Sequence, residues 1–136
     1  MNKQSELILS AHQPNFFPWF GFFEKILKSD VFLFSDDVKY SKQQLTSRIH
    51  VIDNFKKEQV VSVPIDRKKG SRLFEKYIHN DPKQIRKIVN KVLELYYKST
   101  FFNEVEELCQ YFLEKVSENH SLSEINISLI KKICLE

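Results

Sequence analysis

The hydrophobic pattern of this chain changes once, near residue 78, and the change limits the folds that the chain can adopt. Before that point, short apolar runs rich in aromatic and β-branched residues alternate with polar breaks, as is typical of strands. Beyond it, three long segments carry apolar residues at helical spacing. The length of 136 residues suits a single domain. We therefore predict one α/β domain, with an α/β part over residues 1–78 and a helical part over residues 79–136.

Two continuous apolar runs in the front part, residues 7–11 and 31–34, are too short to be helices. Their polar boundaries are those expected of core strands that are covered on both faces. Between them, Phe20, Phe23 and Leu27 occur at helical spacing. We predict a strand–loop–helix–strand unit, with a right-handed crossover if the two strands are parallel.

Two further β-rich runs, residues 48–52 and 58–65, are separated by five residues. This spacing predicts an antiparallel hairpin. The front part is therefore expected to contain a small mixed sheet together with this hairpin.

The helical part begins with a strong start signal. Asp81 and Pro82 are the residue types favoured at the N-cap and at the first helical position. Two more helices are predicted, one over about residues 102–118 and one after a cap at Ser121 or Ser123.

Glycine content excludes two classes of nucleotide-binding site. The chain has only two glycines, Gly21 and Gly70. A Walker-type phosphate loop or a Rossmann fingerprint needs two or three closely spaced glycines. A membrane-spanning helix is not expected either, because the longest apolar run, residues 16–23, is far shorter than the roughly 20 residues required.

Charge and cysteine content point to an ordinary intracellular chain. The net charge is +3, and the basic excess is local. Seven Lys and Arg residues fall within residues 41–70: Lys42, Arg48, Lys56, Lys57, Arg67, Lys68 and Lys69. They favour an anionic partner, the alternatives being a solvated loop face or, less favoured, nucleic acid, for which no supporting motif occurs. Cys109 and Cys134 are expected to be buried thiols of a cytoplasmic protein.

The densest polar motif is the run from His12 to Asn15, between the first predicted strand and the following helix. In open α/β sheets, ligands bind where the strands end. His12 can act as an acid or a base near neutral pH, and Gln13 and Asn15 offer paired donors and acceptors. The motif predicts a binding or catalytic site. The alternative is that His12 ends a strand and its neighbours satisfy the backbone of the loop.

Asp36 and Asp37 follow the second predicted strand and would lie at the same sheet edge if the strands are parallel. Two carboxylates there could hold Mg²⁺ or orient a hydroxyl or amine, the alternative being a solvated turn. Lys39 and Arg48 are cations able to meet a phosphate or carboxylate, and Tyr40 lies between them.

The aromatic run that follows the loop contains Trp19. Most of these rings are expected to form core. Trp19 is the exception, because an indole offers one donor and a flat face suited to stacking on a sugar or a base.

The stretch from His12 to Lys42 resembles the opening of the WbqC-like family, which comprises bacterial proteins associated with O-antigen and other surface-polysaccharide clusters. The matching positions, in order, are His12, Gln13, Pro14, Asn15, Pro18, Gly21, Lys25, Ser29, Asp30, Val31, Phe32, Asp36, Asp37 and Tyr40. Weaker agreement continues to Asn126 and Ile127. The family usually has Asn before the arginine, where this chain has Ser47. Members of the family generally run longer, so a C-terminal portion is expected to be lacking.

The resemblance implies a role in surface-polysaccharide biosynthesis, with an amino-acyl or glycyl group transferred to an activated sugar such as a nucleotide sugar. Such a transfer needs a base and contacts for an anionic donor. The expected catalytic residues are His12, Asp36 and Asp37. The expected substrate-binding residues are Gln13, Asn15, Trp19, Lys39, Tyr40 and Arg48. The alternatives are a non-catalytic module that binds a glycan precursor or a partner enzyme, and, by analogy of fold alone, a nucleotidylyltransferase-like protein.

Overall fold

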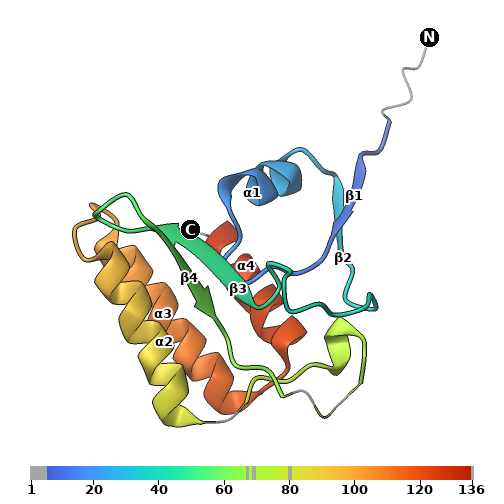
Figure 1. Cartoon of the computed structure of the whole chain (residues 1–136). Coiled ribbons are helices and arrows are strands. Elements are labelled where there is room, and N and C mark those ends of the chain that lie inside the picture. The colour runs from blue at the N-terminus through green and yellow to red at the C-terminus, as the bar shows by residue number, and fades with distance from the viewer. Residues whose placement is uncertain (1–5, 67, 69, 80, 136) are drawn as a thin grey trace.

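A computed structural model describes residues 6–66, 68, 70–79 and 81–135. Within these residues, the four strands lie in the N-terminal half of the chain, and the three long helices follow them in sequence (Figure 1). The elements in order are β1 (Leu9–His12), α1 (Phe20–Leu27), β2 (Val31–Phe34), β3 (Arg48–Ile52), β4 (Glu58–Ser62), the short 3₁₀ helix η1 (Leu73–Glu75), α2 (Pro82–Tyr96), α3 (Phe102–Glu118) and α4 (Leu122–Cys134). The predicted α/β class, with strands first and three helices after them, is confirmed.

The strands form two separate two-stranded sheets. β1 and β2 run parallel and are joined through α1, with His12 opposite Phe34. β3 and β4 form the predicted antiparallel hairpin, with Arg48 opposite Ser62. The parallel and antiparallel pairings expected of a small mixed sheet are thus divided between two sheets. β4 is shorter than predicted and ends just before Pro64, whose nitrogen has no hydrogen to donate.

The sheet of β1 and β2 is not covered on both faces, and that prediction is wrong. Leu9 and Leu33 are 60% and 50% exposed. Phe32, which points to the opposite face, packs its ring against Phe22 of α1 at a centroid distance of 5.6 Å. A continuous apolar run does not distinguish one covered face from two. In a pair of strands covered by a single helix, half of the apolar residues therefore remain open.

The buried face of α1 also differs from the predicted one. Phe22 is 2% exposed, whereas Phe20 and Leu27 are 80% and 83% exposed. The helix starts with apolar residues at nearly every position, so its periodicity does not define which face turns inward. The parallel strands decide this, because Phe22 is the ring that reaches both His12 and Phe32.

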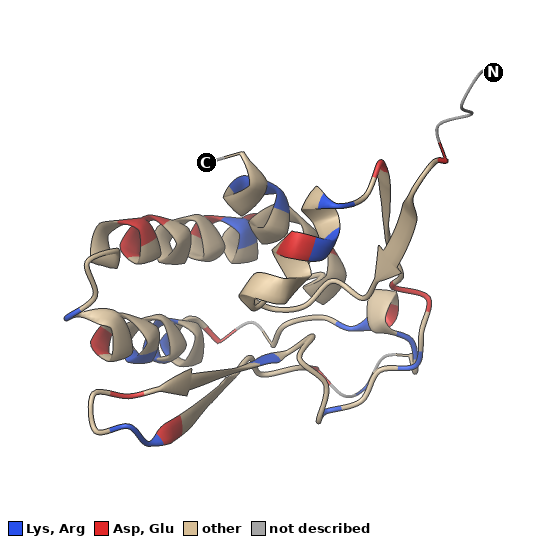
Figure 2. Cartoon of the chain, turned by 90° about the horizontal axis from the view of Figure 1, so that it is seen from above, with Lys and Arg blue, Asp and Glu red and all other residues tan. Residues whose placement is uncertain are grey.

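The core lies among α2, α3, α4 and the hairpin. α2 and α3 pack side by side, with β4 against α2 (Figure 1). Phe16, from the loop after β1, reaches into this core and meets Phe112 of α3 at a centroid distance of 5.5 Å. The exposed sides of the two helices differ in charge, since α3 carries mostly acidic and α2 mostly basic side chains (Figure 2). Because Phe16 packs against Phe112, the loop after β1 attaches the front part of the chain to the helical part.

Both predicted helix starts are confirmed. The Asp81 carboxylate accepts hydrogen bonds from the backbone N–H groups of Lys83 and Gln84, with Pro82 at the first helical position. For α4 the cap is Ser121, whose hydroxyl accepts from the backbone N–H of Glu124.

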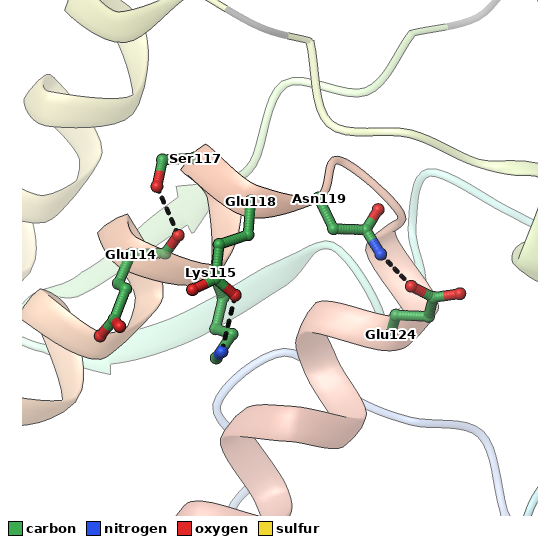
Figure 3. A network of polar contacts seen from close by, with 6 residues as sticks. All are labelled: Glu114, Lys115, Ser117, Glu118, Asn119 and Glu124. Carbon is green, nitrogen blue, oxygen red and sulfur yellow. Dashed lines mark hydrogen bonds and ion pairs between the residues drawn. The ribbon is translucent and has the colours of Figure 1, made fainter.

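The turn between α3 and α4 is held by a local polar network (Figure 3). The Asn119 amide donates to the Glu124 carboxylate, and the Ser117 hydroxyl donates to the Glu114 carbonyl at 2.6 Å. Lys115 pairs with Glu118 at 2.7 Å. The Asn119–Glu124 contact joins the turn to the first turn of α4, while the other two contacts lie within the last turns of α3.

Across the residues that the structure describes, no helix has both the length and the apolar content needed to cross a membrane.

The two cysteines differ in exposure. Cys109 is buried as predicted, but Cys134 is exposed, so the prediction of two buried thiols is wrong. Cys134 is the last residue of α4 and lies where the helix emerges from the core. Burial, with a smaller contribution from the charge of Glu106, raises the pKa of the Cys109 thiol to about 11.

We expect only Cys134 to react with a thiol reagent such as DTNB in the folded protein near pH 8. The thiolate is the reactive form, and a raised pKa together with burial keeps Cys109 protonated and shielded. Desolvation also raises the pKa of Cys134, so its reaction should accelerate as the pH approaches 9. The variant Cys134→Ser should show little reaction until denaturant is added. Rapid labelling of native Cys134→Ser would contradict the assignment.

Candidate functional site

The parallel pairing of β1 and β2 brings their carboxyl ends to one edge. The His12 carbonyl accepts a hydrogen bond from the Ser35 backbone N–H at 2.9 Å, so the two segments that follow the strands start side by side. Two residues of the matching motif support this geometry. Lys25 Nζ donates to the Ala11 carbonyl at 2.7 Å, and the Asp30 carboxylate accepts from the Ile8 N–H at 2.8 Å.

The loop after β1 is held in place from α4. Asn126 is completely buried, and its Nδ2 donates to the carbonyls of Pro14 at 2.9 Å and Thr46 at 2.7 Å. In addition, the Phe16 N–H donates to the Leu45 carbonyl at 2.9 Å. These bonds join the His12 loop to the segment before β3, and both segments to α4. Asn126 begins an Asn-Ile-Ser triplet that matches the glycosylation pattern, and its burial shows that its amide is not available for a glycan.

His12 lies in a pocket of about 490 Å³ whose lining residues are mostly of polar types. Its Nδ1 is 2.9 Å from the Gln13 carbonyl oxygen, and the ring meets Phe22 edge to face at a centroid distance of 5.0 Å. Of the predicted site residues, the structure brings three together here, His12, Gln13 and Asn15. The other lining residues are Ser35, Val38, Gln43, Gln44 and Leu45.

A larger cavity of about 680 Å³ adjoins this pocket, and Asn15 and Leu45 line both. The larger cavity contains two more predicted site residues, Trp19 and Arg48. Gly21 permits the position of the indole, because a Cβ atom there would lie 2.0 Å from a ring carbon of Trp19. The remaining wall is mostly apolar.

The two aspartates lie outside both volumes. The Asp36 carboxylate accepts a hydrogen bond from the Ser123 hydroxyl of α4 at 2.6 Å, and Asp37 is exposed. Within residues 6–66, 68, 70–79 and 81–135, no group of three or more His, Cys, Asp or Glu side chains gathers as a metal site would require. The arrangement therefore gives no support to the Mg²⁺ hypothesis, and in this structure Asp36 joins the front part to α4.

Lys39 and Tyr40 also lie apart from the His12 pocket. Lys39 is exposed, and its backbone pairs with that of Arg72. The Tyr40 hydroxyl is 2.8 Å from the Ser47 hydroxyl. Either hydroxyl can be the donor of this hydrogen bond, so each has the other as a partner.

The basic run does not form one continuous patch. Lys56 and Lys57 lie in the turn between β3 and β4, whereas Lys68 lies in the segment after β4, where its backbone N–H donates to the Asp66 carboxylate at 3.0 Å. Arg48 lines the larger cavity. Arg67 and Lys69 lie outside the described residues. The members named here are therefore distributed over a hairpin turn, a cavity wall and the segment after β4.

Sequence reasoning missed five residues of the His12 pocket, Ser35, Val38, Gln43, Gln44 and Leu45. They belong to segments without strand or helix periodicity. The one available signal was the pair of adjacent amides, Gln43 and Gln44, in a loop that leads to a buried strand. Their approach to His12 depends on contacts between segments about 30 residues apart, and no local pattern encodes it.

We expect Asn126→Ala to lower the free energy of unfolding by about 2–4 kcal/mol, because two buried carbonyls lose their donor. Asn90→Ala, at an exposed position of α2, is the matched control and should change stability by about 0.5 kcal/mol or less. Urea denaturation monitored by circular dichroism measures both. Equal effects of the two substitutions would show that Asn126 does not hold the loop.

Comparison with known proteins places this arrangement in a family. Searches of curated proteins and of solved structures find no match to the chain. The model of the WbqC-like protein family matches residues 13–136, starting within the His12 loop and including α4, which holds that loop. Because the match spans nearly the whole chain, this protein belongs to the WbqC-like protein family.

Proposed function

We propose that this protein is an enzyme of bacterial surface-polysaccharide biosynthesis that transfers an amino-acyl-type group to an activated sugar, with His12 as the general base. Membership of the WbqC-like family is compatible with such a role. The proposal includes a small nucleotide-linked sugar as the substrate and a cytoplasmic location. The observation that carries it is the state and position of the His12 ring.

The hydrogen bond of His12 defines which ring nitrogen is free. A carbonyl oxygen only accepts, so the contact between Nδ1 and the Gln13 carbonyl at 2.9 Å requires the hydrogen to be on Nδ1. In the neutral ring, Nε2 then carries a lone pair and can take a proton. A base in this state can remove the proton that an attacking hydroxyl or amine of the sugar loses as it bonds to the acyl carbon of the activated donor, while the bond from that carbon to the donor's leaving group breaks and the leaving group departs with the electron pair.

The other polar groups of the pocket suit a sugar. Gln13, Asn15, Gln43 and Gln44 each carry an amide with two donors and an acceptor. Sugar hydroxyls also donate and accept, so amides meet them without adding charge. A volume of about 490 Å³ lies within the usual range of small-molecule sites.

The two aspartates have different places in this proposal. Asp36 is engaged with Ser123 and does not line the His12 pocket. We therefore assign it a positioning role between the front part and α4. Asp37, Lys39 and Tyr40 are not included in the reacting site, because they lie outside the pocket that contains His12.

A non-catalytic module that binds a glycan precursor is the second candidate. It is favoured by the amide-rich lining, which binds hydroxyls without reacting with them. The two candidates differ in the result expected when His12 is replaced.

The first test is a thermal-shift screen of nucleotide sugars, with and without Mg²⁺. We expect at least one sugar to raise the melting temperature. For that sugar and an activated glycine donor, His12→Ala should retain binding and lose about 10²–10⁴-fold in turnover, the usual contribution of a general base. His79→Ala removes an exposed histidine outside the pocket and is the control.

A flat response across the whole sugar panel would contradict the proposal. Binding without turnover in the unmodified protein would favour the binding module instead. Full turnover by His12→Ala would remove His12 as the base.

A further inference from the structure

The larger cavity has walls from most of the fold. Its lining comes from the loop after β1, from α1, from the segment before β3 and β3 itself, and from α2, α3 and the end of α4. Its volume of about 680 Å³ is typical of a small-molecule site. Most of the lining is apolar, as in Phe17, Ile49, Leu108 and Ile133, with Trp19 and Phe20 at an exposed rim.

Only three residues of this lining, Asn15, Arg48 and His50, are polar or charged apart from the aromatic donors. His50 already has a partner, since its Nδ1 is 2.6 Å from the Glu58 carboxylate. Arg48 differs, because its Nε is buried and has no hydrogen-bond partner among the described residues. A guanidinium N–H that is removed from water without an acceptor costs free energy. Arg48 is also the one permanently charged side chain among the described residues of this lining, and an anionic group on a ligand would pair with its guanidinium through charge-assisted hydrogen bonds.

We propose that this cavity binds an amphiphile, with an aliphatic chain along the apolar wall and a phosphate or carboxylate head group at Arg48. The chain is favoured over a nucleobase because a base has several donors and acceptors at its edge. The wall offers few polar groups to meet them, and each unmet group would lose its bonds to water. An aliphatic chain has no hydrogen bonds to water to lose, and the burial of its apolar surface favours binding.

The position of the cavity connects it to the proposed reaction. Asn15 and Leu45 line both volumes, so a ligand in the cavity lies directly beside the His12 pocket. This connection rests on the proposed function: the amphiphile would be part of the activated donor or acceptor. Binding itself requires no turnover and can be measured without any sugar.

The protein has a built-in reporter for this site, because Trp19 is its only tryptophan and lines the cavity. Trp19 is 64% exposed, so a bound chain should exclude water from the indole and shift its emission to shorter wavelength. The probes are decyl phosphate and decanoate below their micelle concentrations. Decanol has the same chain without the charge, and uridine monophosphate has a phosphate with a base. We expect saturable shifts with decyl phosphate and decanoate, and a weaker one with decanol.

Three variants separate the charge from the chain. Arg48→Met keeps the apolar stem and should weaken decyl phosphate binding by about tenfold or more, while decanol binding changes little. Arg48→Lys keeps the positive charge and should retain part of the affinity. Arg86→Met removes an exposed arginine of α2 that does not line the cavity, and should bind like the unmodified protein.

Val105→Phe tests the apolar part. Val105 lines the cavity from α3, and a larger ring there should weaken decyl phosphate and decanol alike. Thermal unfolding of each variant verifies that it is folded.

The inference is overturned if decyl phosphate gives no saturable shift. It is also overturned if folded Arg48→Met binds decyl phosphate as well as Arg86→Met does, or if uridine monophosphate binds more tightly than decyl phosphate. If no amphiphile binds but a nucleotide sugar still raises the melting temperature, this inference alone is overturned. Amphiphile binding with a flat sugar panel would overturn the proposed function alone.

Discussion

One buried amide connects the two halves of this protein. Asn126 of α4 donates to the carbonyls of Pro14 and Thr46, which lie 112 and 80 positions earlier in the chain. Buried carbonyls need donors, and the loops that contain these two have no sheet to supply them. Because the Asn126 amide binds both carbonyls at once, it fixes the position of the loop after β1 relative to the segment before β3. Both the His12 pocket and the larger cavity include residues of these two segments in their linings.

The path of the chain after Pro14 then separates a core residue from the cavity residues. Phe17 has a φ of 41°, in the left-handed region that aromatic residues seldom adopt. This bend sends the Phe16 ring onto Phe112, while Pro18 and Trp19 continue along the rim of the cavity. The packing of Phe16 and Phe17 against each other, at a centroid distance of 4.8 Å, offsets the cost of the bend. Backbone strain therefore lies at the boundary between the fold and the proposed site.

Several features were predictable because they depend on neighbouring residues. The cap at Asp81 and the turn length of the hairpin are local, and both were correctly predicted. The position of His12 at the end of a strand was also local. Which segments cover each strand does not depend on neighbouring residues. Leu9 and Leu33 are of a residue type that usually lies in the core, but they lie on an uncovered face of the sheet. The same reason explains Cys134, whose helix is apolar but leaves the core at its last turn.

The sequence alone determined the order of the main strands and helices, the position of His12 at the end of the first strand, and the resemblance of the chain to the WbqC-like family. Only the tertiary structure decided which polar residues meet. It brought Gln43 and Gln44 to His12, turned Asp36 towards Ser123, and placed Arg48 in an apolar wall. The physical reason is that secondary structure follows from bonds and periodicity within a segment, whereas a site is made by contacts between segments. Here those contacts depend on buried groups such as Asn126, whose partners are chosen by packing and not by sequence spacing.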